Sequence, residues 1–118
     1  MILVDDHVLA AHLGGTRAIG PASGGLATTC AWWWRLTTSA GRLHGRPIDD
    51  VPASILVPER VDLLPVMARL GVAYRLSVMA AEALAAAELL GADIVVGQDT
   101  PRLREACRVR GITYLVEA

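Results

Sequence analysis

The sequence predicts an α/β protein folded as a three-layer α/β/α sandwich around a mostly parallel central sheet. Two observations predict this class. Helix and strand signals alternate along the chain, and the strand segments, such as Met1–Val4 and Asp93–Gly97, are continuous apolar runs. Such runs are typical of parallel strands that are buried on both faces. Because crossovers between parallel strands are right-handed, we expect helices on both faces of the sheet.

The N-terminal half is punctuated by glycine and proline. The strand Met1–Val4 leads into a short helix, His7–Leu13, which the glycines at 14 and 15 end. A loop containing Pro21 and Gly24 precedes a helix expected from about Leu26 to Ala40. The elements expected after it are an irregular segment over Gly41–Pro52, a strand over Ser54–Val57, and a helix over Pro58–Leu70 that contains Pro65 and that Gly71 stops.

The C-terminal half has sharper boundaries. Ser77 is a suitable N-cap for a helix through Leu90, and Gly91 occupies the position after it, where a left-handed residue is favoured. The strand Asp93–Gly97 comes next. Thr100 and Pro101 then open a helix through about Arg110, which Gly111 closes before a last strand over Ile112–Val116.

Composition limits the function classes. A length of 118 residues fits one domain, residues 1–118. No apolar run approaches the roughly 20 residues that span a bilayer, and the N-terminus lacks a signal-peptide pattern, so we expect no membrane association and a cytoplasmic location. A net charge of −1 excludes general attraction to polyanions. The two cysteines, Cys30 and Cys107, stand far apart and predict neither a disulfide framework nor a zinc site.

Carboxylates follow two of the predicted strands. Asp5 and Asp6 come directly after the first strand, and Asp99 follows the strand that ends at Gly97. In an open parallel sheet these acids meet at the carboxyl edge, where such folds bind ligands. Asp93 lies at the opposite edge. The first hypothesis is therefore a divalent-metal site that includes Asp5, Asp6 and Asp99.

Glu82 is a third candidate acid. At roughly 100° per residue it falls in the middle of the apolar arc of the helix that begins after Ser77. A desolvated carboxylate there costs several kcal/mol unless it is protonated, paired with one of the arginines, bound to a cation or open to a cleft. Glu82 is thus either one half of an ion pair or a carboxylate of the metal site.

Both ends of the chain resemble PIN-domain proteins. The opening segment MILVDDHVLAAHL is similar to their first strand, aspartate and helix. The closing segment AEALAAAELLGADIVVGQDTPRLREACRVRGITYLVEA is similar to their Ala-rich helix, strand, aspartate, helix and last strand. The resemblance implies a small nuclease-type domain in which clustered acids bind Mg²⁺ or Mn²⁺ and cut RNA. It also implies that the protein is often the toxin of a toxin/antitoxin pair, with an antitoxin-like protein as its partner.

The match to the family's acids is incomplete. Asp5 matches the first acid, and Asp99 matches the acid after the fourth strand. Where the family has a glutamate, this chain has the acid-free segment Thr28–Trp32, and the next family aspartate falls on Ala80, two residues from Glu82. The threonine that commonly precedes the last acid is Gly97 here. Either Glu82 and Asp6 complete an altered site, with Asp5, Asp99 and Glu82 as the catalytic acids, or the chain keeps the fold without nuclease activity.

Two further features concern partners. Trp32, Trp33 and Trp34 sweep roughly 200° of a helix, so at least one ring is exposed or covered by a partner. For that ring we rank a homodimer or protein contact above base stacking. Arg102 and Arg104 lie on the helix after Asp99 and are either RNA-backbone contacts or part of a solvated face.

Two functions remain open. The first is a metal-dependent endoribonuclease that uses Asp5 and Asp99 as ligands and Glu82 and Asp6 as auxiliary acids. The second is a PIN-like interaction or dimerisation module, catalytically inactive, that uses the tryptophan helix.

Overall fold

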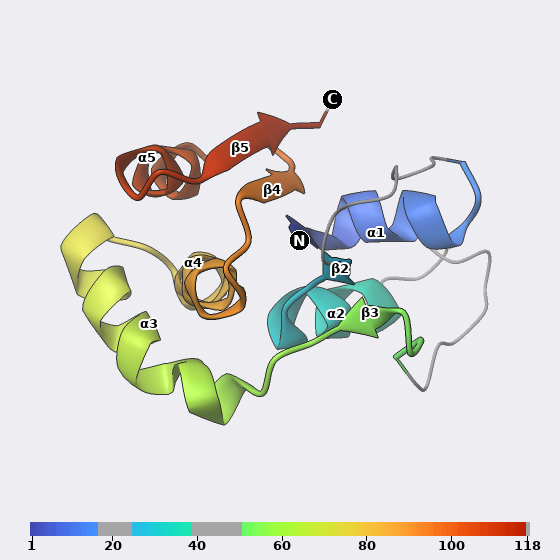
Figure 1. Cartoon of the computed structure of the whole chain (residues 1–118), viewed down its shortest axis with the longest axis horizontal. Helices are drawn as coiled ribbons and strands as arrows, with labels where there is room; N and C mark the ends of the chain where they lie inside the picture. Colours follow the sequence, from blue (N-terminus) through green and yellow to red (C-terminus); the bar gives the residue numbers. More distant parts are fainter. Residues whose placement is uncertain (17–24, 39–50, 118) are drawn as a thin grey trace.

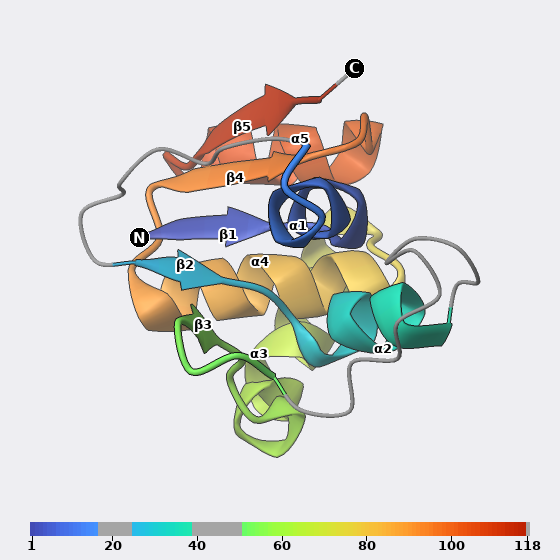
Figure 2. The same cartoon turned by 90° about the vertical axis from the view of Figure 1, so that its right-hand side faces the viewer.

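A five-stranded sheet in which every neighbouring pair of strands runs parallel forms the centre of the protein. The structure, a computed structural model, describes residues 1–16, 25–38 and 51–117. The strands lie in the order β3-β2-β1-β4-β5, as Figure 2 shows side by side. Their bounds are β1 (Ile2–Val4), β2 (Leu26–Ala27), β3 (Ile55–Leu56), β4 (Ile94–Gly97) and β5 (Thr113–Val116).

Helices cover both faces of this sheet. Their bounds are α1 (Asp6–Leu13), α2 (Cys30–Thr38), α3 (Arg60–Tyr74), α4 (Val78–Leu90) and α5 (Pro101–Val109). In Figure 1, α1 lies on one side of the strands and α4 and α5 lie on the other, with α3 packed on the outside of α4. The three-layer α/β/α architecture is therefore confirmed, and the sheet is wholly rather than mostly parallel.

Each face of the sheet has its own apolar core. Leu3 and Val95 point into the larger core, which the Ala-rich helix α4 fills together with α3 and α5. Val4 and Val96 point into the smaller core, beneath α1 and part of α2. Neighbouring residues on a strand face opposite sides, so β1 and β4 need apolar residues at every position. This requirement explains their continuous apolar sequences.

Most of the capping residues that the sequence indicates in the C-terminal half have their expected roles, but the Thr100 hydroxyl makes no cap hydrogen bond to α5 and donates to the Gln98 carbonyl oxygen instead. The Ser77 hydroxyl accepts a hydrogen bond from the Ala80 N–H, and Gly91 ends α4 with a φ of 64°. Pro101 is the first residue of α5, and Gly111 follows that helix with a φ of 75°. Residues at or next to each end therefore provide these caps.

The predicted helix from Leu26 begins too early. Leu26 and Ala27 form β2, which pairs with β1 and β3, and α2 starts only at Cys30. The Thr29 hydroxyl accepts a hydrogen bond from the Trp32 N–H at 3.1 Å, as an N-cap does. That cap separates the strand from the helix. The predicted end at Ala40 lies outside the described residues, as does most of the irregular segment.

Gly71 does not stop α3. The helix continues to Tyr74 and ends at Arg75, which adopts a left-handed φ of 55°. A Cβ atom added at Gly71 would come no closer than 3.8 Å to any neighbouring atom, the Ala81 Cβ of α4 among them. This glycine is therefore part of the interface between the two helices. None of the described helices alone is long and apolar enough to cross a membrane, although α3 and α4, bent by 116°, pass that test as a pair.

Candidate functional site

The candidate site lies where the direction of strand order reverses. From β1 the chain proceeds outward through β2 to β3, then returns to place β4 on the other side of β1. Asp5 follows β1 and Asp99 follows β4, so both acids lie at this switch point. Open α/β sheets bind ligands in the crevice that forms there. Asp93, at the other end of β4, has a side chain that is 79% exposed.

Asp5 is a buried carboxylate held by two backbone donors. Its residue is 3% exposed. One oxygen caps α1 by accepting the Val8 N–H at 2.9 Å, and the other accepts the Gln98 N–H at 2.8 Å. Among the described residues no cationic side chain forms an ion pair with it. The carboxylate is thus fixed in position by backbone donors, without an ion-pair partner in the described part of the chain.

Gly97 makes room for this carboxylate. A Cβ atom at Gly97 would lie 2.8 Å from the Asp5 Oδ2 and 2.9 Å from its Cγ. Those separations are too short for a real contact, so the last residue of β4 must be glycine while Asp5 keeps its place. The threonine expected here from the PIN-like pattern would not fit. The departure from the pattern at Gly97 is therefore tied to the position of Asp5.

Asp99 shares a small cavity with Asp5. The cavity has a volume of about 250 Å³ and lies between the carboxyl edge of the sheet, α2 and α4. The Asp99 side chain is half-exposed and accepts a hydrogen bond from Arg104 Nη1 at 2.6 Å. Other residues that line the cavity include Trp32, Arg35, Ser77, Met79 and Thr100. Two of the predicted acids are therefore brought to one cavity.

Asp6 forms an ion pair with an arginine instead. It is fully buried and accepts two hydrogen bonds from Arg35, from Nε at 2.9 Å and from Nη2 at 2.6 Å. This bidentate pair joins the first residue of α1 to α2. Although Arg35 also borders the cavity that holds Asp5, Asp6 itself does not line it.

Glu82 likewise forms an ion pair with an arginine. It is fully buried, and Arg60 donates to it from Nε at 2.6 Å and from Nη2 at 3.2 Å. The Ala31 N–H in the first turn of α2 donates to the same carboxylate at 2.9 Å. Hydrogen bonding to Glu82 in turn raises the pKa of the Arg60 guanidinium. Of the two interpretations of Glu82, the structure shows the ion pair, which ties α2, α3 and α4 together.

The donor set fits one hard cation better than two. Across the described ranges, His, Cys, Asp and Glu side chains do not gather in any group of three or more. Mg²⁺ often keeps several waters and takes only one or two protein carboxylates, which Asp5 and Asp99 can supply. A two-metal centre needs more acids than this cavity offers.

The tryptophans of α2 face three environments, as their spacing requires. Trp32 is buried in the larger core, Trp33 packs against the smaller core, and Trp34 is 65% exposed. The predicted RNA contacts lie at the surface of α5: Arg104 pairs with Asp99, and Arg102 donates to the Arg75 carbonyl oxygen.

Sequence reasoning missed three residues that shape the site: Thr29, Arg35 and Arg60. Thr29 caps α2, and its position before an apolar helix was a usable signal. The two arginines carried no local signal, because each meets its acid 22 or 29 residues away.

The chain was compared with known proteins by sequence and by structure. No family model matches it, and neither a curated protein nor a solved structure does. The resemblance of the two end segments to PIN domains therefore stays a prediction from the sequence.

Proposed function

We propose that this chain is a PIN-like domain that binds one Mg²⁺ or Mn²⁺ between Asp5 and Asp99 and hydrolyses RNA at that point. One observation carries the proposal. Asp5 is a buried carboxylate that borders a cavity at the switch point and has no ion-pair partner among the described residues. Burying an uncompensated charge is costly, and a cation in the cavity would remove that cost.

The side chains around the cavity would have different roles at a bound cation. A bound cation would polarise a phosphodiester and lower the pKa of a bound water. Asp5 is the fixed ligand, because the Val8 and Gln98 N–H groups hold its two oxygens while leaving further lone pairs free. Asp99 is the adjustable ligand, because its side chain is half-exposed and only a surface arginine holds it. Arg104, once released from Asp99, is then available to the RNA backbone.

Metal binding tests the proposal directly. Millimolar Mg²⁺ or Mn²⁺ is expected to raise the melting temperature of the protein, because a ligand at 100 times its Kd stabilises the folded state by about 2.7 kcal/mol. Asp99→Asn should abolish this response without unfolding the protein, since it removes only a surface pair. Asp93→Asn is the matched control, because it removes an acid at the opposite edge of the sheet.

RNA cleavage is the second readout. The wild-type protein and Asp93→Asn should cut a labelled single-stranded RNA with Mn²⁺ and lose that activity in EDTA, whereas Asp99→Asn should be inactive under both conditions. A melting temperature insensitive to both metals, or a response that survives in Asp99→Asn and Asp5→Asn, would contradict the proposal.

A second candidate function is a non-catalytic PIN-like interaction module. It is favoured by the two arginine pairs, which occupy Asp6 and Glu82, and by the exposed ring of Trp34. In this case neither metal would change stability, and Trp34→Ala would instead weaken self-association or the binding of an antitoxin-like protein. Sedimentation of the wild-type protein and of Trp34→Ala distinguishes the two functions.

A further inference from the structure

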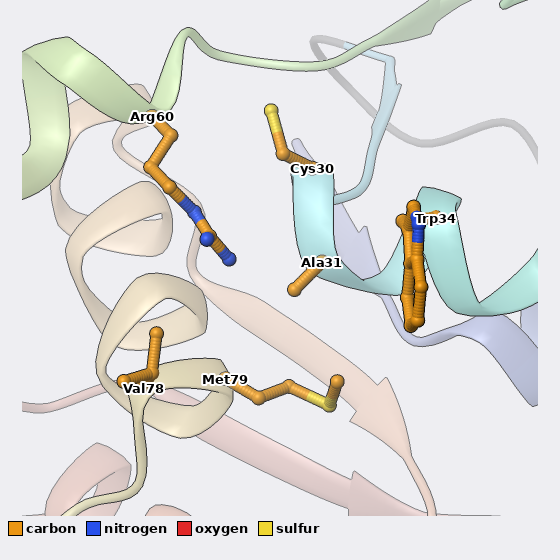
Figure 3. A pocket seen from close by; sticks show the side chains of 6 residues that line it. All are labelled: Cys30, Ala31, Trp34, Arg60, Val78 and Met79. Atoms are coloured by element: carbon orange, nitrogen blue, oxygen red, sulfur yellow. The ribbon is translucent and has the colours of Figure 1, made fainter.

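A second and larger cavity adjoins the one that holds Asp5. Its volume is about 650 Å³, and it lies between the first half of α2, the start of α4 and the first residue of α3. It is lined by Cys30, Ala31, Trp34, Arg60, Val78 and Met79, which Figure 3 shows. Its volume falls within the range of small-molecule sites, about 300–1,000 Å³.

The lining combines a flat aromatic ring with one cationic group. Figure 3 shows Trp34 on one side of the cavity and the Arg60 guanidinium on the other. The side chain of Met79 extends from α4 toward α2. Val78 is also exposed, so apolar surface faces solvent on α4 as well as on α2. An exposed indole and a polarisable thioether suit a flat, partly apolar ligand.

Arg60 is held in place and still has donors to offer. Its Nε and Nη2 atoms bind the buried Glu82 carboxylate, which the Ala31 N–H holds in turn. Its Nη1 atom makes no hydrogen bond within the described part of the chain. Because a guanidinium cannot lose its proton in a protein, Nη1 remains a donor at any ordinary pH. The cavity therefore contains a positioned donor directed at acceptors such as ring nitrogens, carbonyls or phosphate oxygens.

The two cavities share one lining side chain. Met79 lines both, and α2 contributes Trp32 to the smaller one and Ala31 and Trp34 to the larger one. A chain whose phosphate lay beside Asp5 and Asp99 would thus have the Trp34 cavity next to it. Among ligands with a flat ring and hydrogen-bond acceptors, a base attached to such a phosphate is the one that the adjacency of the two cavities favours.

We propose that the Trp34 cavity is a nucleobase subsite, in which an unpaired base of single-stranded RNA stacks on Trp34 and accepts a hydrogen bond from Arg60 Nη1. The inference rests on the proposed function for its choice of RNA as the ligand. The subsite itself needs no metal, because neither Trp34 nor Arg60 belongs to the carboxylate pair. Base binding and cleavage can therefore be measured separately.

Cys30 provides a footprint of the occupied subsite in the unaltered protein. It lines the cavity and is partly exposed, whereas the only other cysteine, Cys107, is fully buried and its burial raises the thiol pKa to about 11. A maleimide at pH 7.5 should therefore label Cys30 alone. In EDTA, a saturating oligoadenylate or oligouridylate of about ten nucleotides is expected to slow this labelling several-fold, and a duplex of the same length is not. Labelling that proceeds at the same rate with and without the single strand would overturn the subsite.

Substitution of Trp34 measures the contribution of stacking. Trp34→Ala should weaken the binding of a fluorescein-labelled oligonucleotide in EDTA by about tenfold, while Trp34→Phe retains most of the affinity. Val72→Ala, which truncates an exposed apolar residue elsewhere on α3, should leave the affinity unchanged. Equal RNA affinity in the wild-type protein and Trp34→Ala, together with a loss of self-association in Trp34→Ala, would replace the subsite with a protein contact.

The failure of the subsite is distinguishable from the failure of the nuclease. Asp99→Asn should lose cleavage and keep both the Cys30 footprint and RNA binding. A footprint without cleavage in the wild-type protein would support the subsite and overturn the nuclease. Cleavage without a footprint would support the nuclease and overturn the subsite.

Discussion

The buried carboxylates Glu82 and Asp5 differ in what surrounds their charge. Glu82 receives two hydrogen bonds from Arg60 and one from the Ala31 N–H, so a full positive charge lies against it. Asp5 receives two backbone N–H groups and no cationic side chain from the residues that the structure describes, and it borders a cavity. Both are almost inaccessible to water. A buried acid with its own arginine holds the fold together, whereas one without a cation is the better place to look for a ligand.

Asp6 belongs with Glu82 in this comparison. It is a direct neighbour of Asp5 in the sequence, yet it faces Arg35 and not the cavity. Adjacent residues at the start of a helix point in different directions, so one acid serves the packing of α1 on α2 while the other faces the candidate site. Asp5 and Asp6 thus differ in the direction and the partner of their side chains, not in burial.

The largest expected effect comes from removing the partner of Glu82. Arg60→Gln leaves a buried, uncompensated carboxylate and should lower the free energy of unfolding by about 3–5 kcal/mol. Glu82→Gln should cost clearly less, because an amide oxygen can still accept the Ala31 N–H and the Arg60 side chain, 42% exposed, can be solvated. Urea unfolding of both variants measures the asymmetry. Equal losses would mean that Glu82 is not held as a charged group.

Cys107 is a buried ionisable group that, unlike the buried carboxylates, stays neutral. Burial, aided by the negative charge of Glu88, raises its pKa from 9.0 to about 11. The unfolded chain therefore loses the thiol proton first. The stability that this confers is complete below about pH 9 and is lost as the pH rises through about 11, at up to about 1.4 kcal/mol per pH unit.

Urea midpoints measured between pH 8 and 10.5 under reducing conditions test this slope. Cys107→Ala should show a shallower decline, because it removes the thiol. Part of the decline in stability with pH should remain in both proteins because of Tyr114, since burial also raises the pKa of its phenol. A decline of the same steepness in both proteins would assign the whole effect to other groups.

Gly97 tests how rigidly Asp5 is held. Gly97→Ala places a methyl group against the Asp5 carboxylate, which two N–H groups hold, and should cost about 1–3 kcal/mol and remove the response to divalent metals. Gly71→Ala is the matched control. It adds a methyl group inside α3 with ordinary contacts and should be neutral or stabilising by up to about 1 kcal/mol. A tolerated Gly97→Ala would show that Asp5 can move aside.

Local patterns in the sequence predicted what local chemistry controls. Ser77, Gly91 and Pro101 act within a few residues of themselves, so the helix ends near them were predictable. Asp5 and Asp99 were also predictable as members of one edge, since continuous apolar strands imply a parallel sheet.

The partners of the other two acids could not be predicted in this way. Glu82 was recognised as needing a partner, yet choosing Arg60 from eleven arginines requires the packing of α3 on α4. The same holds for Asp6, whose partner lies on α2. The strand Leu26–Ala27 was missed because two apolar residues carry too little periodicity to separate a strand from the start of a helix.

The smallest expected effect concerns Arg104, which would compete with a bound cation for the Asp99 carboxylate. The pair is about half-exposed, so Arg104→Gln should change the free energy of unfolding by less than about 1 kcal/mol. It should nevertheless tighten the binding of Mn²⁺ a few-fold, because the cation no longer has to displace a guanidinium. Arg108→Gln is the matched control on the same helix: it breaks a similar pair with Glu105, which does not line the cavity. Titration calorimetry with the three proteins separates the cases, since equal Mn²⁺ affinities would remove Asp99 from the ligand set and contradict a cation held between Asp5 and Asp99.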